Sequence, residues 1–222
     1  MCCLSNCIGL KTLAVAGLIA GVVGFSTFGT SVFAEPPKDQ PKQAQPKAGV
    51  KIGDAAPVFS VQDQDGKKVN LSDFKGKIVV LEWFNPGCPF VVGAHEKGLL
   101  KDYAAKAVKD DGVVWLSIAT GPAADKTSIT TARKNWSISN PVLMDKDGTV
   151  AKAYGAKTTP HMFVIDKEGK LAYMGAIDNA PMGKVDGGGE TINYVANAIK
   201  ELKAGTAVST PETRSYGCSV KF

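Results

Sequence analysis

The chain has 222 residues, of which 44% are hydrophobic and 21% charged, a balance that suits one globular domain with appendages. It excludes wholesale disorder and a polytopic membrane protein. The 26 Lys and Arg residues exceed the 21 Asp and Glu residues to give a net charge of +5, but the basic residues are interleaved with acids. Without a basic stripe we predict no nucleic-acid partner.

Residues 1–34 have the composition of a signal peptide. Lys11 precedes the apolar run Leu13–Phe25, which is short for a bilayer span, and small residues follow up to Ala34. We predict cleavage near Ala34 and export to the periplasm or the extracellular space. The protein would contact a membrane only if this segment stayed uncleaved.

That cleavage changes the cysteine content of the protein. Cys2, Cys3 and Cys7 lie in the segment that is removed, so the mature chain keeps only Cys88 and Cys218. In an oxidising compartment, two cysteines far apart in sequence form a structural disulfide, act as a redox pair or stay free. The residues around Cys88, described below, favour a redox role.

The remaining chain divides into a linker, a body and a tail. Residues 35–50 are rich in Pro, Lys and Gln, with hardly an apolar side chain, and we predict a disordered linker. Residues 51–205 form the predicted domain. The tail, 206–222, carries Cys218, and its last apolar residues alternate with polar ones, which indicates an extended segment that docks against the body.

The body begins with a hairpin signal, because Val58–Val61 and Lys68–Leu71 flank Asp65-Gly66. The nearly continuous apolar run Lys77–Phe84 predicts a central strand that is covered on both faces.

Pro89 fits the first turn of a helix, which we predict to continue until Gly112. Later strands are predicted at Val113–Ala119, Val142–Met144, His161–Asp166 and Lys170–Ile177. Later helices are predicted at Asp125–Trp136, Thr149–Tyr154 and Thr191–Leu202. This order predicts the α/β class, with a central mixed β-sheet flanked by helices and an N-terminal β-hairpin extension.

The motifs in this order resemble the thioredoxin-like superfamily. A cysteine separates the first central strand from its helix, and a Thr-Pro pair stands just before the closing hairpin. More narrowly, Val69–Lys77 resembles the opening of the redoxin and peroxiredoxin-like branch, of the AhpC/TSA type. The resemblance covers about Ala56–Leu202 and rests on WFNPGCPF, TTPHMFVID and SYGCSVKF together. It implies a thioredoxin-like fold and a thiol redox function.

Cys88 is the predicted nucleophile. It lies where a strand ends and a helix begins, so the helix amides and dipole favour its thiolate, which attacks disulfides and peroxides. Thioredoxins carry a second cysteine at the position where this chain has Val91. The alternative for Cys88 is an inert buried cysteine, which rarely lies in an Asn-Pro-Gly-Cys-Pro turn.

If Cys88 corresponds to the first cysteine of thioredoxins, Glu82, on the preceding strand, corresponds to their buried acid with no gap in the chain. A carboxyl group under the nucleophile can carry protons in thiol–disulfide exchange, and we assign Glu82 a catalytic role. The alternative, a solvent-facing or salt-bridged strand residue, fits poorly in the apolar run Ile78–Phe84. His95, further along the helix, is assigned to the surface or the core and not to catalysis.

The peroxiredoxin pattern around the cysteine is incomplete. Peroxiredoxins place a Pro and a Thr upstream of their peroxidatic cysteine, where this chain has Leu81 and Asn85. Their arginine is also missing, and Thr159-Pro160 instead follows the thioredoxin pattern, in which this bond is cis and faces the active-site sulfur. Disulfide exchange is therefore favoured over peroxide removal.

The resemblance also assigns substrate-binding residues. The backbone before the cis proline of thioredoxins pairs with bound peptide, which points to Thr159 and Pro160. His161 would lie close by and either tunes Cys88 or hydrogen-bonds locally. Asn85 and Gly87, in the turn before the cysteine, complete the predicted set.

Cys218 is the partner that the mature chain offers to Cys88. Closing the long loop between them requires little more entropy than closing a shorter one, because the cost grows with the logarithm of loop length. A tail that delivers a resolving thiol resembles the two-cysteine cycle of peroxiredoxins, and we assign Cys218 a catalytic role. Cys218 could equally stay free or pair with another molecule.

Two functions follow. The first is an exported thiol redox enzyme that acts on protein disulfides or peroxides, is renewed by an external thiol reductant, and needs no cofactor and no metal. The alternative is a non-catalytic thioredoxin-fold binding module, such as a copper or cytochrome-maturation accessory. In that module soft ligands would come from Cys88, His161, Met162 and Met174.

Overall fold

The structure is a computed structural model that describes residues 49–96 and 99–222. The predicted signal peptide 1–34, its cleavage site near Ala34 and residues 35–48 of the predicted linker lie outside the described residues. Val50, at the end of the predicted linker, is buried in the core. Among the described helices, none is long and apolar enough to cross a bilayer.

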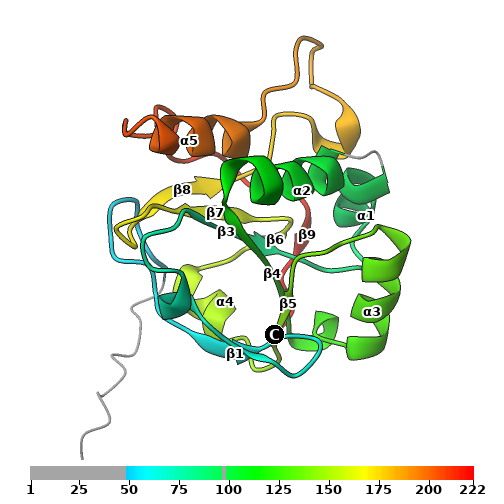
Figure 1. The fold of residues 1–222 in the computed structure, drawn as a ribbon. Coiled ribbons are helices and arrows are strands. Elements are labelled where there is room, and N and C mark those ends of the chain that lie inside the picture. Colours follow the sequence, from blue (N-terminus) through cyan, green and yellow to red (C-terminus); the bar gives the residue numbers. More distant parts are fainter. Residues whose placement is uncertain (1–48, 97–98) are drawn as a thin grey trace, which may run out of the picture. The chain divides into compact units, whose positions relative to one another are not determined.

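A mixed sheet of five strands forms the centre of the described residues (Figure 1). Its strands, in the spatial order β5-β4-β3-β7-β8, are β5 (Val142–Asp145), β4 (Val114–Thr120), β3 (Val79–Trp83), β7 (Met162–Ile165) and β8 (Leu171–Gly175). The strands β3, β4 and β5 are parallel, whereas β7 is antiparallel to both β3 and β8. Every residue of β3 is buried, which confirms the central strand predicted from the apolar run.

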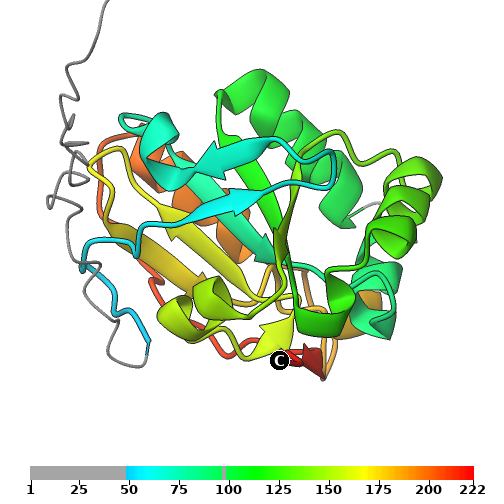
Figure 2. The same ribbon diagram turned by 90° about the horizontal axis from the view of Figure 1, so that it is seen from below.

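Helices cover both faces of this sheet. They are α1 (Pro89–Glu96), α2 (Leu99–Asp111), α3 (Lys126–Asn135), α4 (Thr149–Tyr154) and α5 (Tyr194–Lys203). One face packs against α2 and α5 and, towards the carboxyl ends of the parallel strands, against α1 and α3. The opposite face packs against α4 and the N-terminal hairpin (Figure 2). This arrangement agrees with the thioredoxin-like fold that the resemblance implied.

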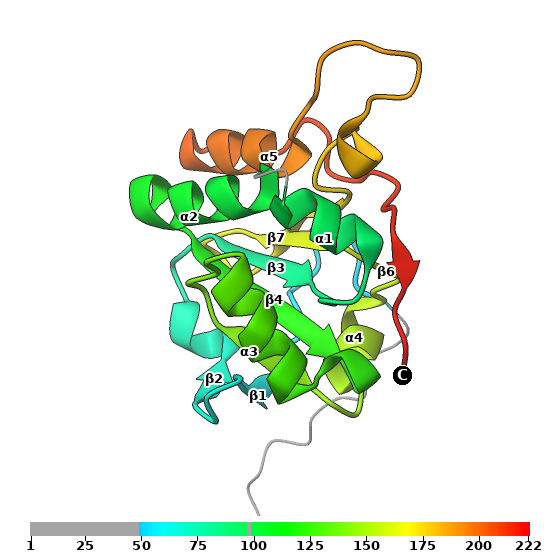
Figure 3. The same cartoon turned by 90° about the vertical axis from the view of Figure 1, so that its right-hand side faces the viewer.

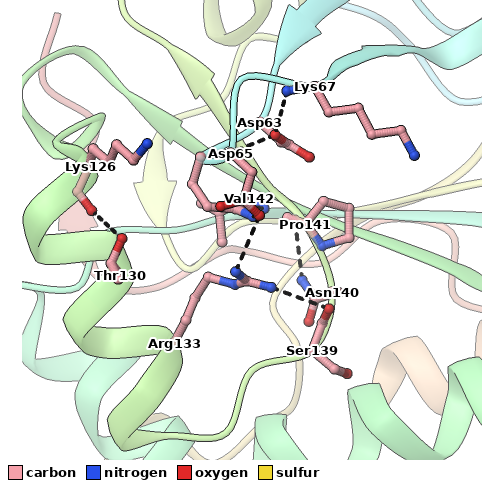
Figure 4. A network of polar contacts seen from close by, with 11 residues as sticks. Asp63, Asp65, Lys67, Lys126, Thr130, Arg133, Ser139, Asn140, Pro141 and Val142 are labelled. Carbon is pink, nitrogen blue, oxygen red and sulfur yellow. Dashed lines mark hydrogen bonds and ion pairs between the residues drawn. The ribbon is translucent and has the colours of Figure 1, made fainter. Parts of the chain in front are cut away.

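The predicted N-terminal hairpin is present and covers one edge of the sheet. Its strands β1 (Ser60–Gln62) and β2 (Lys68–Asn70) are antiparallel. Past β1 the hairpin runs along the edge strand β5, where Gln64 and Val142 exchange two hydrogen bonds of 3.0 and 2.7 Å. Figure 4 shows the Arg133 side chain of α3 directed towards Asp65 and Ser139. Its Nη1 lies 3.8 Å from Asp65 Oδ2, and its Nη2 donates a hydrogen bond to the Ser139 carbonyl. These contacts fasten the turn of the hairpin to the body.

Two helix predictions differ from the structure. The single helix predicted from Pro89 to Gly112 is two helices, α1 and α2, and residues 97–98 between them lie outside the described residues. The sequence has Gly98 at that point, and glycine has a low helix propensity. The last helix begins at Tyr194 and not at Thr191, because the Asn193 side chain accepts a hydrogen bond from the Ala196 amide and caps the helix there.

Short elements complete the described part of the chain. Its 3-10 helices span Leu71–Phe74, Gly121–Ala123 and Pro181–Gly183. The remaining strands, β6 (Thr158–Thr159) and β9 (Cys218–Ser219), pair with each other in an antiparallel manner. Figure 3 shows the tail passing β6 as β9, so the tail docks as an extended segment, as its alternating pattern indicated.

Candidate active site

A tight turn places Cys88 at the start of α1. The Asn85 side chain accepts a hydrogen bond from the Gly87 amide at 2.9 Å, and the Asn85 carbonyl accepts one from the Cys88 amide at 3.0 Å. Pro89 then begins the helix, so the Cys88 side chain lies beside the amino end of α1. Only 1% of the Cys88 surface is exposed. The sequence prediction of a cysteine between a strand and a helix is confirmed.

The tail and the Thr159-Pro160 segment meet at this cysteine. The Cys88 thiol donates a hydrogen bond to the Thr159 carbonyl at 3.0 Å, and its sulfur lies 2.7 Å from the sulfur of Cys218. Both cysteines are free thiols. Cys218 is opposite Thr159 in the β6–β9 pair, and the Thr159-Pro160 bond is cis, as the resemblance implied.

The two thiols have opposite pKa shifts. Burial raises the pKa of Cys88, but hydrogen bonds with the side chains of Cys218 and Thr159 and with the backbone of Val91 and Cys218 outweigh it, so the net pKa is lowered. For Cys218, burial, the hydrogen bond with Cys88 and the charge on Cys88 raise the pKa to about 11. The geometry therefore stabilises a thiolate on Cys88 and a protonated donor on Cys218.

Glu82 lies on the face of β3 that α1 covers, and only 1% of it is exposed. Its Oε2 accepts hydrogen bonds from Trp115 Nε1 at 3.0 Å and from the Ser117 hydroxyl at 2.9 Å. Both donors come from β4, where Ser117 is the register partner of Glu82. Two fixed donors hold the carboxylate in place, so Glu82 is a core residue and not a solvent-facing strand residue.

His95 is buried beside Glu82, and the sequence did not indicate this contact. Its Nε2 lies 3.5 Å from Glu82 Oε1, and its ring stacks on Trp136 with a centroid distance of 4.9 Å. Among the described residues, neither ring nitrogen of His95 nor Oε1 of Glu82 has a hydrogen-bond partner. The assignment of His95 to surface or core is resolved in favour of the core.

The other predicted substrate-binding residues lie around Cys88 at different depths. Asn85 and Thr159 line a cleft together with Phe84, Thr120, Pro122, Ala123, Val220 and Lys221. Gly87 is exposed and lines a second cleft along α3. His161 is buried, and its Nδ1 accepts a hydrogen bond from the Lys157 amide at 3.2 Å. Of the two roles considered for His161, the structure shows the local hydrogen bond.

The soft ligands considered for a copper module do not converge. Met162 pairs with Gly175 and faces the side of the sheet covered by α2 and α5, whereas Met174 pairs with Phe163 and faces the opposite side. One ion cannot contact both sulfurs and Cys88. In the described part of the chain, no three His, Cys, Asp or Glu residues are grouped so that they could hold a metal ion.

Several residues that fasten the tail were missed by the sequence reasoning. The Tyr216 hydroxyl donates to Asp178 at 2.7 Å, and the Tyr216 ring lies 6.0 Å from that of Phe90 on α1. Thr213 hydrogen-bonds with the Tyr173 hydroxyl at 2.6 Å. The alternation of apolar residues in the tail marked Tyr216 but could not name its partners, which lie far from it along the chain.

The chain is similar to proteins of one family. The AhpC/TSA family model matches residues 52–174. The thiol-disulfide oxidoreductase ResA of Bacillus cereus (strain ATCC 10987 / NRS 248) is 32% identical over 156 residues, which cover 69% of this chain and 79% of that protein. A crystal structure of a hypothetical protein from Sinorhizobium meliloti 1021 has a TM-score of 0.68 at 27% identity and covers 79% of this chain and 98% of its own. An uncharacterized conserved protein from Geobacillus kaustophilus also has a TM-score of 0.68, at 26% identity, with coverages of 78% and 92%.

Proposed function

Because the chain belongs to the AhpC/TSA family, in the redoxin branch of the thioredoxin-like superfamily, we propose that it is an exported thiol–disulfide oxidoreductase with a two-cysteine cycle. Its 32% sequence identity to a thiol-disulfide oxidoreductase supports an oxidoreductase that acts on thiols and disulfides. The observation that carries the proposal is the contact of Cys88 with Cys218, at 2.7 Å between the sulfurs, on a strand of the tail. A docked tail supplies the second thiol that the residues after Cys88 lack.

The cycle has three steps. The Cys88 thiolate attacks one sulfur of a protein disulfide, which forms a mixed disulfide and releases the other substrate cysteine as a thiolate. Cys218, once deprotonated, attacks Cys88 and releases the second substrate cysteine. The enzyme now holds a Cys88–Cys218 disulfide, and the substrate has gained two electrons and two protons. An external dithiol then reduces the enzyme and becomes a disulfide itself.

Glu82 and the residues around Cys88 have supporting roles in this proposal. Glu82 takes up and returns the proton that Cys218 must lose before it attacks, since it is a buried carboxyl on the α1 side of the sheet. Thr159 and Pro160 hold the substrate backbone, while Asn85 and Gly87 both line the second cleft, along α3. His161 supports the Thr159-Pro160 segment through its bond with Lys157.

The proposal is tested by reduction of insulin disulfides with a dithiol as electron donor. The protein should catalyse the reaction, and Cys88→Ser should abolish it. Without the dithiol, Cys218→Ser should react once and keep a mixed disulfide on Cys88, which mass spectrometry detects, and with the dithiol it should turn over more slowly than the original protein. An unchanged rate in Cys88→Ser would refute the proposed function. The same variants with hydrogen peroxide test the other substrate, and faster turnover with peroxide would overturn the preference for disulfides.

The role of Glu82 is tested by Glu82→Gln. The amide oxygen can still accept from Trp115 and Ser117, so the packing is retained while the exchangeable proton is lost. We expect the resolving step to slow by roughly 100-fold, with a changed pH profile, as for the loss of a general acid–base group. A pH profile identical to that of the original protein would exclude this role.

Export is tested on the protein made from the full sequence. Expression in a bacterial host followed by mass measurement should show a mature chain that begins at Glu35. A chain that keeps residues 1–34 and stays in the cytoplasm would contradict the proposal.

A further inference from the structure

The tail crosses Cys88 in a fixed register. Cys218 and Ser219 pair with Thr159 and Thr158, and the Thr159 hydroxyl donates to the Cys218 carbonyl at 3.4 Å. The tail therefore occupies the backbone edge beside Cys88 on which an extended substrate would have to lie. A substrate strand and the tail cannot use this edge at the same time.

The residue before Cys218 has room for a hydrogen atom only. Gly217 has φ +124°, and a Cβ at this position would overlap the carbonyl oxygen of Thr159. A strand that follows this path past Thr159 must have glycine directly before its cysteine.

The residue before that glycine, Tyr216, is half-buried and contacts residues of two other segments. The Tyr216 hydroxyl donates to Oδ1 of Asp178 at 2.7 Å, and the same oxygen accepts from the Ala180 amide at 2.8 Å. Asp178 is only 4% exposed, so its carboxylate is held in a fixed position beside the Tyr216 hydroxyl. The Phe90 ring of α1, close to Cys88 in the chain, contacts the Tyr216 ring at a centroid distance of 6.0 Å.

We propose that Phe90 and Asp178 form a recognition pocket for polypeptide partners, and that Tyr216-Gly217-Cys218 occupies it as a built-in substitute for such a partner. The inferred partner is an extended segment with an aromatic residue, preferably Tyr, then Gly, then a disulfide-bonded Cys. This inference rests on the proposed thiol–disulfide exchange at Cys88.

The reaction at this pocket begins when the tail leaves the Thr159 edge and the partner strand takes its place, with its cysteine at the position of Cys218. The Cys88 thiolate bonds to that cysteine sulfur, the partner disulfide breaks, and its other sulfur leaves as a thiolate that takes a proton from water. The aromatic side chain in the pocket sets which cysteine of the partner is attacked.

The inference is tested with full-length Cys218→Ser, in which Cys88 reacts without being resolved. The probes are the peptide Ser-Tyr-Gly-Cys-Ser-Val with its cysteine bonded to thionitrobenzoate, its Tyr→Ala and Gly→Val versions, and a small hydroxyethyl–thionitrobenzoate disulfide as reference. Release of thionitrobenzoate gives the rate. We expect the tail-sequence peptide to react about tenfold faster than either altered peptide, since it alone fills the pocket and clears Thr159.

Variants of the protein give an independent readout. Tyr216→Ala combined with Cys218→Ser empties the pocket, so the rate with the tail-sequence peptide should rise relative to the small probe, while the Tyr→Ala peptide gains less. A Tyr→Phe version of the peptide is the further probe for the hydroxyl contact with Asp178. Asp178→Ala should remove the preference for the Tyr peptide over the Phe peptide, whereas Asp178→Asn keeps an acceptor oxygen and should retain it.

Equal rates for all three peptides, with a reactive small probe, would overturn the recognition pocket and leave the proposed function intact. Failure of every probe, the small one included, would instead refute exchange at Cys88. The rates of thionitrobenzoate release therefore test the recognition pocket and the exchange at Cys88 separately.

Discussion

At the scale of single residues, the two thiols of the site are unequal because of what each one touches. Cys88 lies beside the amino end of α1 and accepts hydrogen bonds as a thiolate, so its pKa is lowered in spite of its burial. Cys218 faces that negative charge, and its pKa is raised. The first sulfur is prepared to attack, and the second holds its proton until the first has reacted.

This difference predicts the effect of Cys218→Ala. Loss of the hydrogen bond from Cys218 should raise the pKa of Cys88, whereas Cys218→Ser, which keeps a donor, should raise it less. The measurement is the pH dependence of iodoacetamide alkylation at Cys88, followed by peptide mass. Conversely, Cys88→Ala should lower the pKa of Cys218, since both the charge and the hydrogen bond of Cys88 are removed. A Cys88 pKa that is equal in the original protein and both Cys218 variants would contradict the assignment.

A site residue could be predicted from the sequence where the residues next to it along the chain determine where its side chain lies. The place of Cys88 followed from a local motif, a strand, a turn and a helix in succession, while Glu82 and Thr159 were assigned through the resemblance to thioredoxins. His95 beside Glu82 and Asp178 beside Tyr216 were not found. The His95 contact depends on how α1 packs on the sheet, and the Asp178 contact depends on the path of the tail. A local sequence pattern predicts neither the packing nor the path.

At the scale of elements, the tail is fastened at several separate points. Thr213 hydrogen-bonds with the Tyr173 hydroxyl of β8, and the Tyr216 hydroxyl donates a hydrogen bond to Asp178. Further along, β9 pairs with β6, and the Val220 amide donates to the Lys157 carbonyl at 3.0 Å. The tail therefore covers Cys88, which is 1% exposed, and we expect release of the tail to control access to the sulfur.

Gly217→Ala tests this control. The new Cβ would overlap the Thr159 carbonyl, and φ of +124° disfavours any other residue, so β9 should detach from β6. We expect Cys88 to react faster with a bulky maleimide, by about tenfold or more, and the Cys88–Cys218 disulfide to form more slowly with oxidant. Ser215→Ala is the control, since residue 215 already carries a Cβ. Maleimide rates that match the original protein would show that β9 does not limit access.

Most elements were predicted from the sequence for simple reasons. Long apolar runs gave the buried strands, and Asp65-Gly66 gave the hairpin. The pairing of β9 with β6 joins segments that are far apart in the chain, so only its extended character was foreseen. Local patterns determine what an element is, while its distant partner depends on packing.

At the scale of the whole molecule, the stability depends on pH through His161. Burial, followed by the charge of Lys157, lowers the pKa of His161 to about 4 from an ordinary value of 6.5. Between these values the unfolded chain binds a proton that the folded chain excludes. The free energy of unfolding should therefore fall by about 3 kcal/mol as the pH drops from 6.5 to 4, and level off below that.

Urea unfolding of the original protein and of His161→Asn, measured at several pH values, checks this effect. Carboxyl groups titrate in both proteins, so the difference between the two curves isolates His161. We expect that difference to change steadily between pH 6.5 and 4. A difference that stays constant over this range would mean that His161 accepts a proton as easily in the folded protein as in the unfolded chain.

Segments from both ends of the described residues cover the edges of the central sheet. The hairpin runs along β5, where Asp63 bridges Leu143, and the tail runs along β8, where the Met174 amide donates to Pro211 and the Thr213 amide donates to Met174. Unpaired strand edges are templates for association between molecules. Full release of the tail would thus bare a row of backbone donors and acceptors on β8 as well as a reactive sulfur. The same tail therefore protects the protein from association and covers its reactive cysteine. Light scattering should detect the release of the tail as clearly as a thiol assay does.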